Sequence, residues 1–231
     1  MHLQLFVRYM HSHSTSFVRF RVQASRLVDK VEGICRNIEA NENSWSVRLN
    51  ELMTLQKLIS STKRNPYVWT TQILQRLDKP LASQIQDLRS SIVREACKTI
   101  QIFSKCLEDA FRPLAKTLLP ILMEVLGCGN KVISSYVNDC CTILIQNTHV
   151  KSAFSLLSEI VRTSRSKLVR ERSMEYMLVM LEMWPLEDMQ RHEHHVSSAL
   201  KTGLADASSE TRAAARKCFH AFSECFPECA R

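Results

Sequence analysis

The stretch 130–147, NKVISSYVNDCCTILIQN, decides the fold class. Apolar or weakly polar side chains recur along it at the i, i+3, i+4, i+7, i+8, i+11 spacing of a helix with one buried face. These residues are Ile133, Tyr136, Val137, Cys140, Cys141 and Leu144. The same stripe returns one unit earlier and two units later, at Val93, Ala96, Cys97 and Ile100 and at Ala215, Cys218, Phe219 and Phe222. A recurring half-buried helix predicts packed copies of one unit.

Each such helix follows a polar turn, and the turns recur roughly every 40 residues, a period typical of solenoids. The turns open at residues 43–46, 87–90, 129–132, 165–168 and 206–209. Each unit is long enough for two helices. The predicted pairs are 22–39 with 46–62, 67–86 with 90–108, 113–127 with 131–147, 150–163 with 167–183, and 187–204 with 209–224. We therefore expect an all-α fold, an α-solenoid of about five helix hairpins.

Prolines and serines mark the boundaries of these predicted helices. Pro66, Pro113, Pro185 and Pro227 fall between pairs, where a helix must stop. Serines lie near the starts of second helices, where a hydroxyl can accept a hydrogen bond from a free backbone N–H. They are Ser44, Ser90, Ser166 and Ser208.

The two ends of the chain differ from the repeated units. Residues 1–21 are basic, Ser-containing and free of acids, which is superficially like a transit peptide. We interpret them as a poorly ordered leader or an atypical chain start. The repeat domain is then expected over residues 22–231. The chain stops where a sixth unit would begin. We therefore expect that a neighbouring domain covers this end of the array or that the sequence is a fragment of a longer protein. In either case we expect the domain to be monomeric.

Composition and charge narrow the classes of function. The formal charge of +8 favours acidic partners, which include nucleic acid, anionic membranes and acidic proteins. No apolar run reaches the length of about 20 residues that spans a bilayer, so we expect no membrane insertion. Clustered Lys/Arg runs are absent from the sequence and aromatic content is 7%, which argues against nucleic acid. The nine cysteines form no framework and indicate a reducing, intracellular compartment.

The residue patterns of catalysis and cofactor binding are missing. The four glycines form neither a dinucleotide-binding nor a P-loop spacing, and no Gly-x-Ser-x-Gly motif occurs. In the run 192–195, HEHH, only His192 and His195 share a helical face, and no Cys or Asp completes a zinc site. We expect no enzyme activity, no cofactor and no metal.

The turns predict a linear binding surface, because turns at equivalent points of stacked repeats lie along one edge. Trp45 sits in a polar stretch at the first turn, where an exposed aromatic is a common binding anchor. The other predicted residues are Arg89, Ser90, Lys131, Lys167, Arg170 and Arg212. Positive charge near a helix N-terminus opposes the macrodipole, so its recurrence there favours a role in binding. We interpret Trp69 and Trp184, in contrast, as packing residues.

Several of these turn motifs resemble the TOG domains of the CLASP family, the cytoplasmic linker-associated microtubule proteins, most closely their second TOG module. The motifs are Trp45, the stretch 87–97 (DLRSSIVREAC), 147–150 (NTHV), 166–173 (SKLVRERS) and 206–217 (DASSETRAAARK). They occur in the family's order over about residues 25 to 227. The N-terminal leader of this chain does not match the family. The family's sixth repeat, its basic, Ser-rich lattice-binding region and a second TOG array have no counterpart in this sequence.

The resemblance implies a flat HEAT-repeat array, of the armadillo-like class, whose intra-repeat loops bind αβ-tubulin. It further implies control of microtubule dynamics by suppressing catastrophe and promoting rescue, with a location in the cytoplasm on microtubules and spindle. By position, Trp45 corresponds to the family's tubulin-contacting tryptophan. Arg89 and Ser90 fall in the second loop, Lys131 in the third, Lys167 and Arg170 in the fourth, and Arg212 in the fifth.

Two other interpretations remain open from the sequence. A generic HEAT-repeat scaffold would bind a peptide or protein through its concave helical face, independently of Trp45. A nucleic-acid-binding array would lose affinity steeply with salt, because binding releases counterions.

Overall fold

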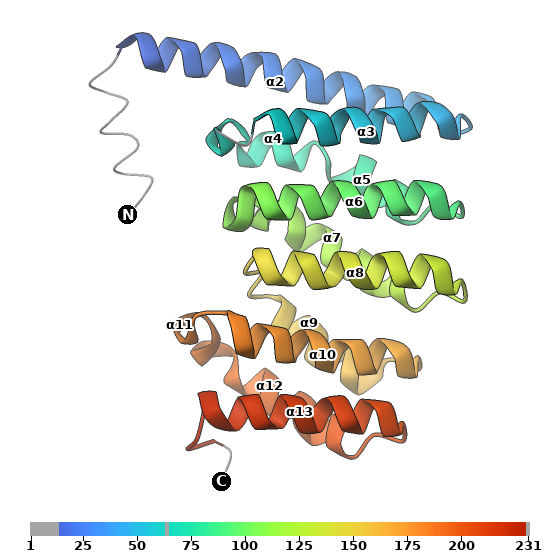
Figure 1. Cartoon of the computed structure of the whole chain (residues 1–231), viewed down its shortest axis with the longest axis vertical. Coiled ribbons are helices and arrows are strands. Elements are labelled where there is room, and N and C mark those ends of the chain that lie inside the picture. Colours follow the sequence, from blue (N-terminus) through green and yellow to red (C-terminus); the bar gives the residue numbers. More distant parts are fainter. Residues whose placement is uncertain (1–13, 63–64, 230–231) are drawn as a thin grey trace.

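The computed structural model describes residues 14–62 and 65–229, with side chains from residue 24 onward. The described residues form a ladder of helix hairpins in two layers and contain no strand (Figure 1). The front layer holds α3 (Trp45–Ser61), α6 (Ser90–Leu107), α8 (Lys131–Asn147), α10 (Lys167–Met183) and α13 (Ser209–Cys225). Each of these helices packs on the next, which confirms the all-α solenoid.

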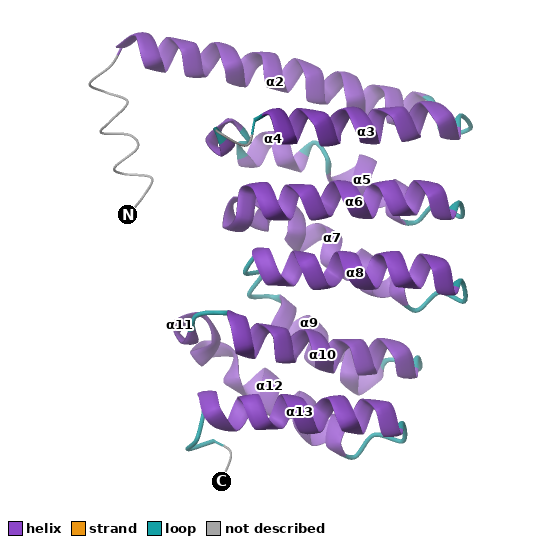
Figure 2. Cartoon of the chain, viewed as in Figure 1, coloured by secondary structure: helices purple, strands orange, loops and turns teal. Residues whose placement is uncertain are grey.

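The remaining helices complete the hairpins. They are α2 (Ser14–Ala40), α4 (Thr71–Gln75) with α5 (Asp78–Ile85), α7 (Arg112–Leu126), α9 (Ala153–Thr163), and α11 (Leu186–Met189) with α12 (Glu193–Leu204). Short 3₁₀ turns span Pro66–Val68, Glu108–Phe111 and Gln190–His192. The loops gather at the two side edges of the ladder (Figure 2).

Three predicted first helices differ from the structure. Helix α2 begins at Ser14, eight residues before the predicted start at residue 22, so the end of the predicted leader is helical. Residues 1–13 of that leader lie outside the described residues. The predicted helix 67–86 is split into α4 and α5, because Pro80 has no N–H to donate to residue 76 and its ring crowds that carbonyl. The predicted helix 187–204 is likewise divided by the 3₁₀ turn Gln190–His192.

The apolar stripes form the core, as predicted for the second helices. On α8, Val137, Cys140, Cys141 and Leu144 are fully buried, so the adjacent cysteines are packing residues. Trp69 and Trp184 are also buried, and each indole N–H is bonded, to Thr62 Oγ1 at 2.7 Å and to the Ile145 carbonyl at 2.9 Å. Phe219 is an exception, since its side chain is 39% exposed on α13.

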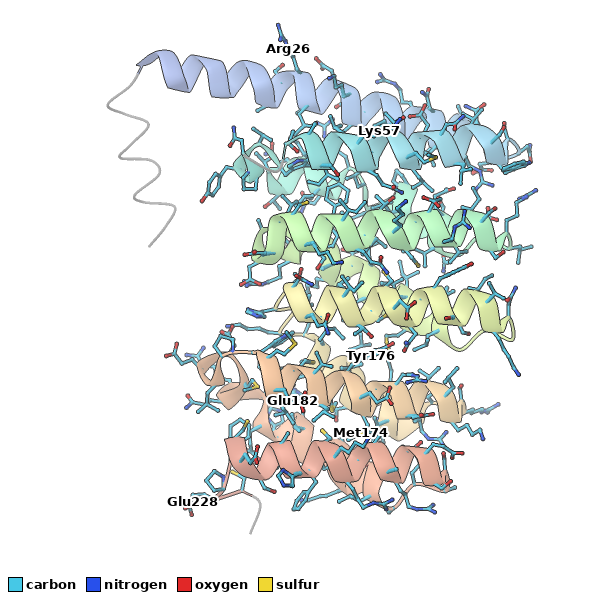
Figure 3. The ribbon with its side chains drawn as sticks, viewed as in Figure 1. Arg26, Lys57, Met174, Tyr176, Glu182 and Glu228 are labelled. Carbon is cyan, nitrogen blue, oxygen red and sulfur yellow. The ribbon has the colours of Figure 1, made fainter. Side chains whose placement is uncertain are left out.

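Polar bonds between neighbouring repeats fix the register of the stack. The hydroxyl of Tyr176, labelled in Figure 3, donates to Asn138 Oδ1 at 2.9 Å and so joins α10 to α8. Burial raises the pKa of this phenol well above its usual range. In the same way, Gln56 Nε2 donates to Thr99 Oγ1 at 3.2 Å between α3 and α6. Because a buried polar group is costly when unpaired, these bonds favour one alignment of the helices.

Candidate binding edge

Five turns that join the two helices of a hairpin lie along one edge of the described ladder, the right-hand edge in Figure 1. We number them turn 1 (41–44), turn 2 (86–89), turn 3 (127–130), turn 4 (164–166) and turn 5 (205–208), and call this line the turn edge. Each turn ends at the N-terminus of a front helix. The edge is therefore lined by residues at helix starts, as the repeat pattern predicted.

Capping explains how some of the turns are fixed. Asn130 Oδ1 accepts hydrogen bonds from the backbone N–H groups of Val132 and Ile133, at 3.0 and 3.3 Å. Ser166 and Ser208 cap α10 and α13, as predicted. The prediction was wrong for the other two serines. Ser44 precedes α3 but makes no side-chain cap bond, and Ser90 is the first residue of α6.

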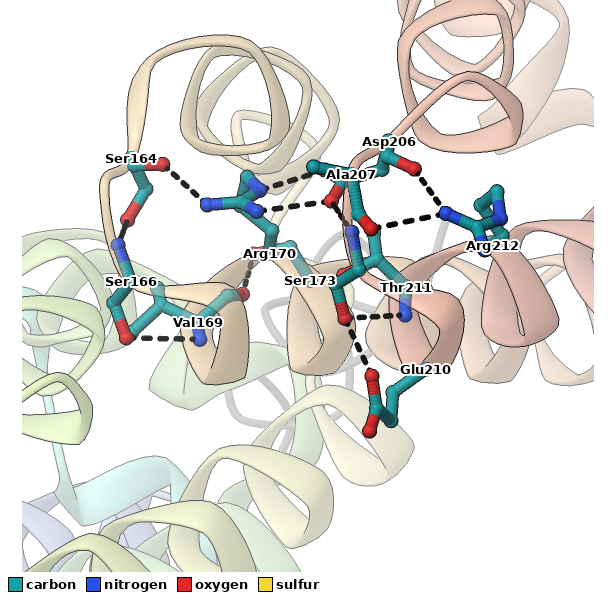
Figure 4. A network of polar contacts seen from close by, with 11 residues as sticks. Ser164, Ser166, Val169, Arg170, Ser173, Asp206, Ala207, Glu210, Thr211 and Arg212 are labelled. Atoms are coloured by element: carbon teal, nitrogen blue, oxygen red, sulfur yellow. Dashed lines mark hydrogen bonds and ion pairs between the residues drawn. The ribbon is translucent and has the colours of Figure 1, made fainter.

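Buried arginine–aspartate pairs connect two adjacent pairs of turns. Arg170, the fourth residue of α10, binds both carboxylate oxygens of Asp206 in turn 5, at 2.6 and 2.9 Å (Figure 4). Arg48, the fourth residue of α3, binds Asp87 in turn 2 at 2.7 Å. We call these two pairs the turn clamps. Each aspartate also accepts a hydrogen bond from the backbone N–H two residues later. Each clamp therefore joins a front helix to the backbone of the next repeat's turn.

The clamp charges are largely withdrawn from solvent. The side chains of Arg170 and Asp206 are 15% and 5% exposed, and those of Arg48 and Asp87 are 5% and 10% exposed. The hydrogen bonds from Arg170 hold the pKa of the Asp206 carboxyl below its usual value. A bidentate arginine–carboxylate pair of this kind fixes geometry as well as charge.

Arg212 occupies the equivalent fourth position of α13 and folds back onto turn 5. Its Nη1 donates to the carbonyls of Asp206 and Ala207, at 2.6 and 3.0 Å. Of the predicted site residues, Arg170 and Arg212 are thus engaged in holding turns 4 and 5. A direct contact of either with a partner stays a prediction, and the observed bonds give both a positioning role.

The other predicted residues present their side chains to solvent to different degrees. Trp45 begins α3 with its side chain 49% exposed, and Lys131 and Lys167 begin α8 and α10 on the surface. Arg89 is exposed at the end of turn 2, with its guanidinium 3.7 Å from Asp87 Oδ1. Ser90 is half-buried. The structure therefore brings the predicted residues to one edge. Arg170 and Arg212 are hydrogen-bonded within the edge, whereas the other predicted residues are exposed or half-buried.

Two exposed apolar residues on the turn edge were missed from the sequence. Leu88 is 93% exposed at the tip of turn 2, and Val132 is 51% exposed in the first turn of α8. With Trp45 they place one exposed apolar side chain in, or directly after, each of turns 1 to 3. The exposure of Leu88 could have been predicted from the sequence. Leu88 stands in a polar turn between Asp87 and Arg89, before the buried stripe of the helix begins.

Turn 3 is flanked by a cleft on each side. The cleft toward turn 2 has a volume of about 480 Å³ and is lined in part by Leu88, Glu124 and Asn130. The cleft toward turn 4 has a volume of about 510 Å³ and is lined in part by Lys131, Leu168 and Arg172. Side chains of a partner could enter the edge on either side of this central turn.

The opposite edge carries His149 and His192. The backbone N–H of His149 donates to Asp109 Oδ1 at 2.8 Å and its ring packs on Trp184, so this histidine is structural. His192 stacks on Phe154. No group of His, Cys, Asp or Glu within the described residues could hold a metal ion. In that part of the chain, helices with the length and hydropathy to cross a membrane are also absent.

Comparison with known proteins agrees with this architecture. The family model described as CLASP N terminal matches residues 27–231. The chain belongs to this family. It is 29% identical over 191 residues to the CLIP-associated protein of Arabidopsis thaliana, and 28% identical over 203 residues to CLIP-associating protein 1-B of Xenopus laevis. These alignments cover 82% and 87% of the chain but only 13% and 14% of the relatives, so the chain spans about one seventh of their length.

Solved TOG domains share the fold. The structure described as "TOG-tubulin binding specificity promotes microtubule dynamics and mitotic spindle formation" aligns with a TM-score of 0.65 at 13% identity, over 90% of this chain and 84% of that one. The CEP104 TOG domain aligns with a TM-score of 0.61 at 14% identity, over 90% and 87%. The family resemblance and the TOG-type HEAT-repeat fold expected from the turn motifs are thereby confirmed. The closer likeness to a second TOG module stays a prediction.

Proposed function

We propose that residues 22–231 form a TOG domain that binds αβ-tubulin through the turn edge and regulates microtubule dynamics. The observation that carries the proposal is the exposed apolar side chain in, or directly after, each of turns 1 to 3, together with the exposed lysines at the starts of α8 and α10. One of the solved TOG structures that share this fold is described by its tubulin-binding specificity, which supports the same partner.

The edge combines the features of a protein-binding surface. Trp45 and Leu88 supply apolar area that becomes buried on binding, and aromatic residues are enriched among the residues that dominate binding energy. Lys131 and Lys167 complement an acidic partner, which speeds association and fixes register more than it adds affinity. The turn clamps hold the neighbouring turns in place, so less ordering is required when a partner binds.

The proposed mechanism is conformational and needs no catalytic step. A bound domain shifts the shape of tubulin at a microtubule end only by the difference in its affinities for the two shapes. A difference of about 1.4 kcal/mol changes the population ratio about tenfold. Through such a difference the domain would suppress catastrophe, promote rescue and stabilise microtubules. The site of action would be the cytoskeleton, on microtubules and the spindle.

A matched pair of exposed apolar residues tests the proposal. Leu88 lies on the turn edge, whereas Met183, which is 53% exposed, ends α10 at the opposite edge. We expect Leu88→Ser to weaken binding to unpolymerised αβ-tubulin several-fold in size-exclusion co-elution, and Met183→Ser to leave it unchanged. Equal binding by both variants would contradict the proposal and favour a scaffold that binds through a helical face.

A further inference from the structure

A groove runs between α2 and α3, the two helices at the N-terminal end of the ladder. It consists of two hollows, of about 340 and 550 Å³, which share Lys30, Leu58 and Ser61 in their walls. One hollow reaches Val68 in the 3₁₀ turn after α3, and the other reaches Asn37 near the end of α2. The groove therefore follows the helix pair along much of its length, separately from the turn edge.

The lining of this groove is apolar below and basic at its rim. Leu27 and Ile34 are buried in its floor, and Leu58 is half-buried. Three exposed basic residues flank it: Arg26 and Lys30 on α2, and Lys57 on α3, with Arg26 and Lys57 labelled in Figure 3. Among the described lining residues there is one carboxylate, that of Glu51, against these three basic side chains, and it accepts a hydrogen bond from Asn37 Nδ2 at 2.7 Å. The rim thus favours an anionic occupant.

Gly33 keeps part of this groove open. It lies in the interior of α2, where glycine costs about 1 kcal/mol relative to alanine. A Cβ built at this position would meet no atom within 4 Å, so no close approach of another helix requires glycine there. The missing side chain instead leaves free volume in the wall of the larger hollow.

We infer that the α2–α3 groove binds an acidic peptide segment of a partner protein, with apolar side chains on the groove floor and carboxylates beside Arg26, Lys30 and Lys57. The charge of the rim and the apolar floor both fit this occupant. Nucleic acid fits less well, because the described lining contains no aromatic side chain on which a base could stack. This site is independent of the turn edge and of tubulin binding there.

Fluorescence anisotropy of a fluorescein-labelled 12-residue peptide of glutamates with two leucines tests the inference on the full chain. We expect Arg26→Gln/Lys30→Gln/Lys57→Gln to weaken binding about tenfold at 0.15 M salt, since three exposed charge pairs of about 0.5 kcal/mol each are lost. The charge-matched control is Lys116→Gln/Lys201→Gln/Lys217→Gln, which changes exposed lysines on α7, α12 and α13. It should remain within about twofold of the wild type, because these lysines lie outside the groove.

Two substitutions of Gly33 separate a specific groove from general charge attraction. Gly33→Leu should fill the groove and weaken peptide binding, whereas Gly33→Ala should retain binding and raise helix stability. Circular dichroism confirms that each variant is folded. Equal losses in both triple variants, no peptide binding at 100 µM wild type, or a groove-dependent preference for a single-stranded oligonucleotide of equal charge would overturn the inference. Trp45→Ala should leave peptide binding unchanged.

Discussion

Turns 2 and 5 differ from turn 3 in how they are held to the preceding repeat. In turns 2 and 5 an aspartate lies two residues before the N-cap of the next helix. It accepts hydrogen bonds from the fourth residue of the preceding front helix, Arg48 for Asp87 and Arg170 for Asp206. At turn 3 the equivalent position holds Cys128, and Ser134 Oγ donates to the Leu126 carbonyl within its own hairpin, at 2.8 Å. Turn 3 also has a cleft on each side.

The comparison shows that a basic residue near a turn does not by itself mark a binding site. Arg170 and Lys167 lie three residues apart on one helix, yet Arg170 is engaged with Asp206 and Lys167 faces solvent. The clamped turns provide a fixed frame, and in the proposed function the exposed residues at the starts of α3, α6, α8 and α10 would supply the contacts. The two clefts beside turn 3 give a partner's side chains room to enter there.

Breaking a turn clamp should have the largest effect on stability. We expect Arg170→Ala to lower the free energy of unfolding by about 3 kcal/mol, because it leaves the buried Asp206 carboxylate without its partner. Arg162→Ala is the control, since its pair with Glu159 is exposed to solvent and should change the free energy of unfolding far less. Urea unfolding measures both. If both variants lost similar free energy of unfolding, the clamp would contribute no more to stability than an exposed ion pair.

The contribution of the Arg170–Asp206 clamp to stability should depend on pH, because it requires a charged Asp206 carboxylate. Its folded pKa is lowered, so its contribution to stability is present above the unfolded pKa of about 3.9 and is lost as pH falls through the folded value. Asp206→Asn should cost about 1.5 kcal/mol at pH 7, because a neutral acceptor bonds arginine less strongly. The difference between wild type and variant should shrink below about pH 4. Urea unfolding of wild type and variant at pH 7, 5 and 3 measures this difference in stability. A difference that does not change with pH would show that the charge of the Asp206 carboxylate does not stabilise the fold.

A smaller effect is expected from the cap of turn 3. Asn130→Ala should cost about 1 kcal/mol, because the first N–H groups of α8 lose their acceptor. The equivalent change at turn 1, Ser44→Ala, should have almost no effect, since Ser44 makes no side-chain cap bond. Thermal unfolding of the two variants compares them. A larger loss for Ser44→Ala would mean that turn 3 is held in another way.

Much of this fold could be predicted from the sequence because its signals are local. The stripe on α8 and the polar turn before it are contained in 18 residues, 130–147, and they predicted both the helix and its buried face. The clamps could not be found in this way. The partners in Arg170–Asp206 are 36 residues apart, and only the packing of consecutive repeats brings them together. Leu88 could have been predicted, because it stands in a polar turn between Asp87 and Arg89, but it was missed because apolar residues are assigned to the core by default.

The central claim, that exposed residues of the turn edge bind tubulin, is tested most directly by analytical ultracentrifugation with unpolymerised αβ-tubulin. Trp45→Ala should lose about 2 kcal/mol of binding, or roughly 30-fold in affinity, and Lys131→Ala/Lys167→Ala should also weaken the complex. Lys116→Ala/Lys217→Ala, which removes equal charge away from the edge, should bind as the wild type does. A folded wild-type chain that fails to co-sediment at tens of micromolar tubulin, or equal binding by all variants, would contradict the claim.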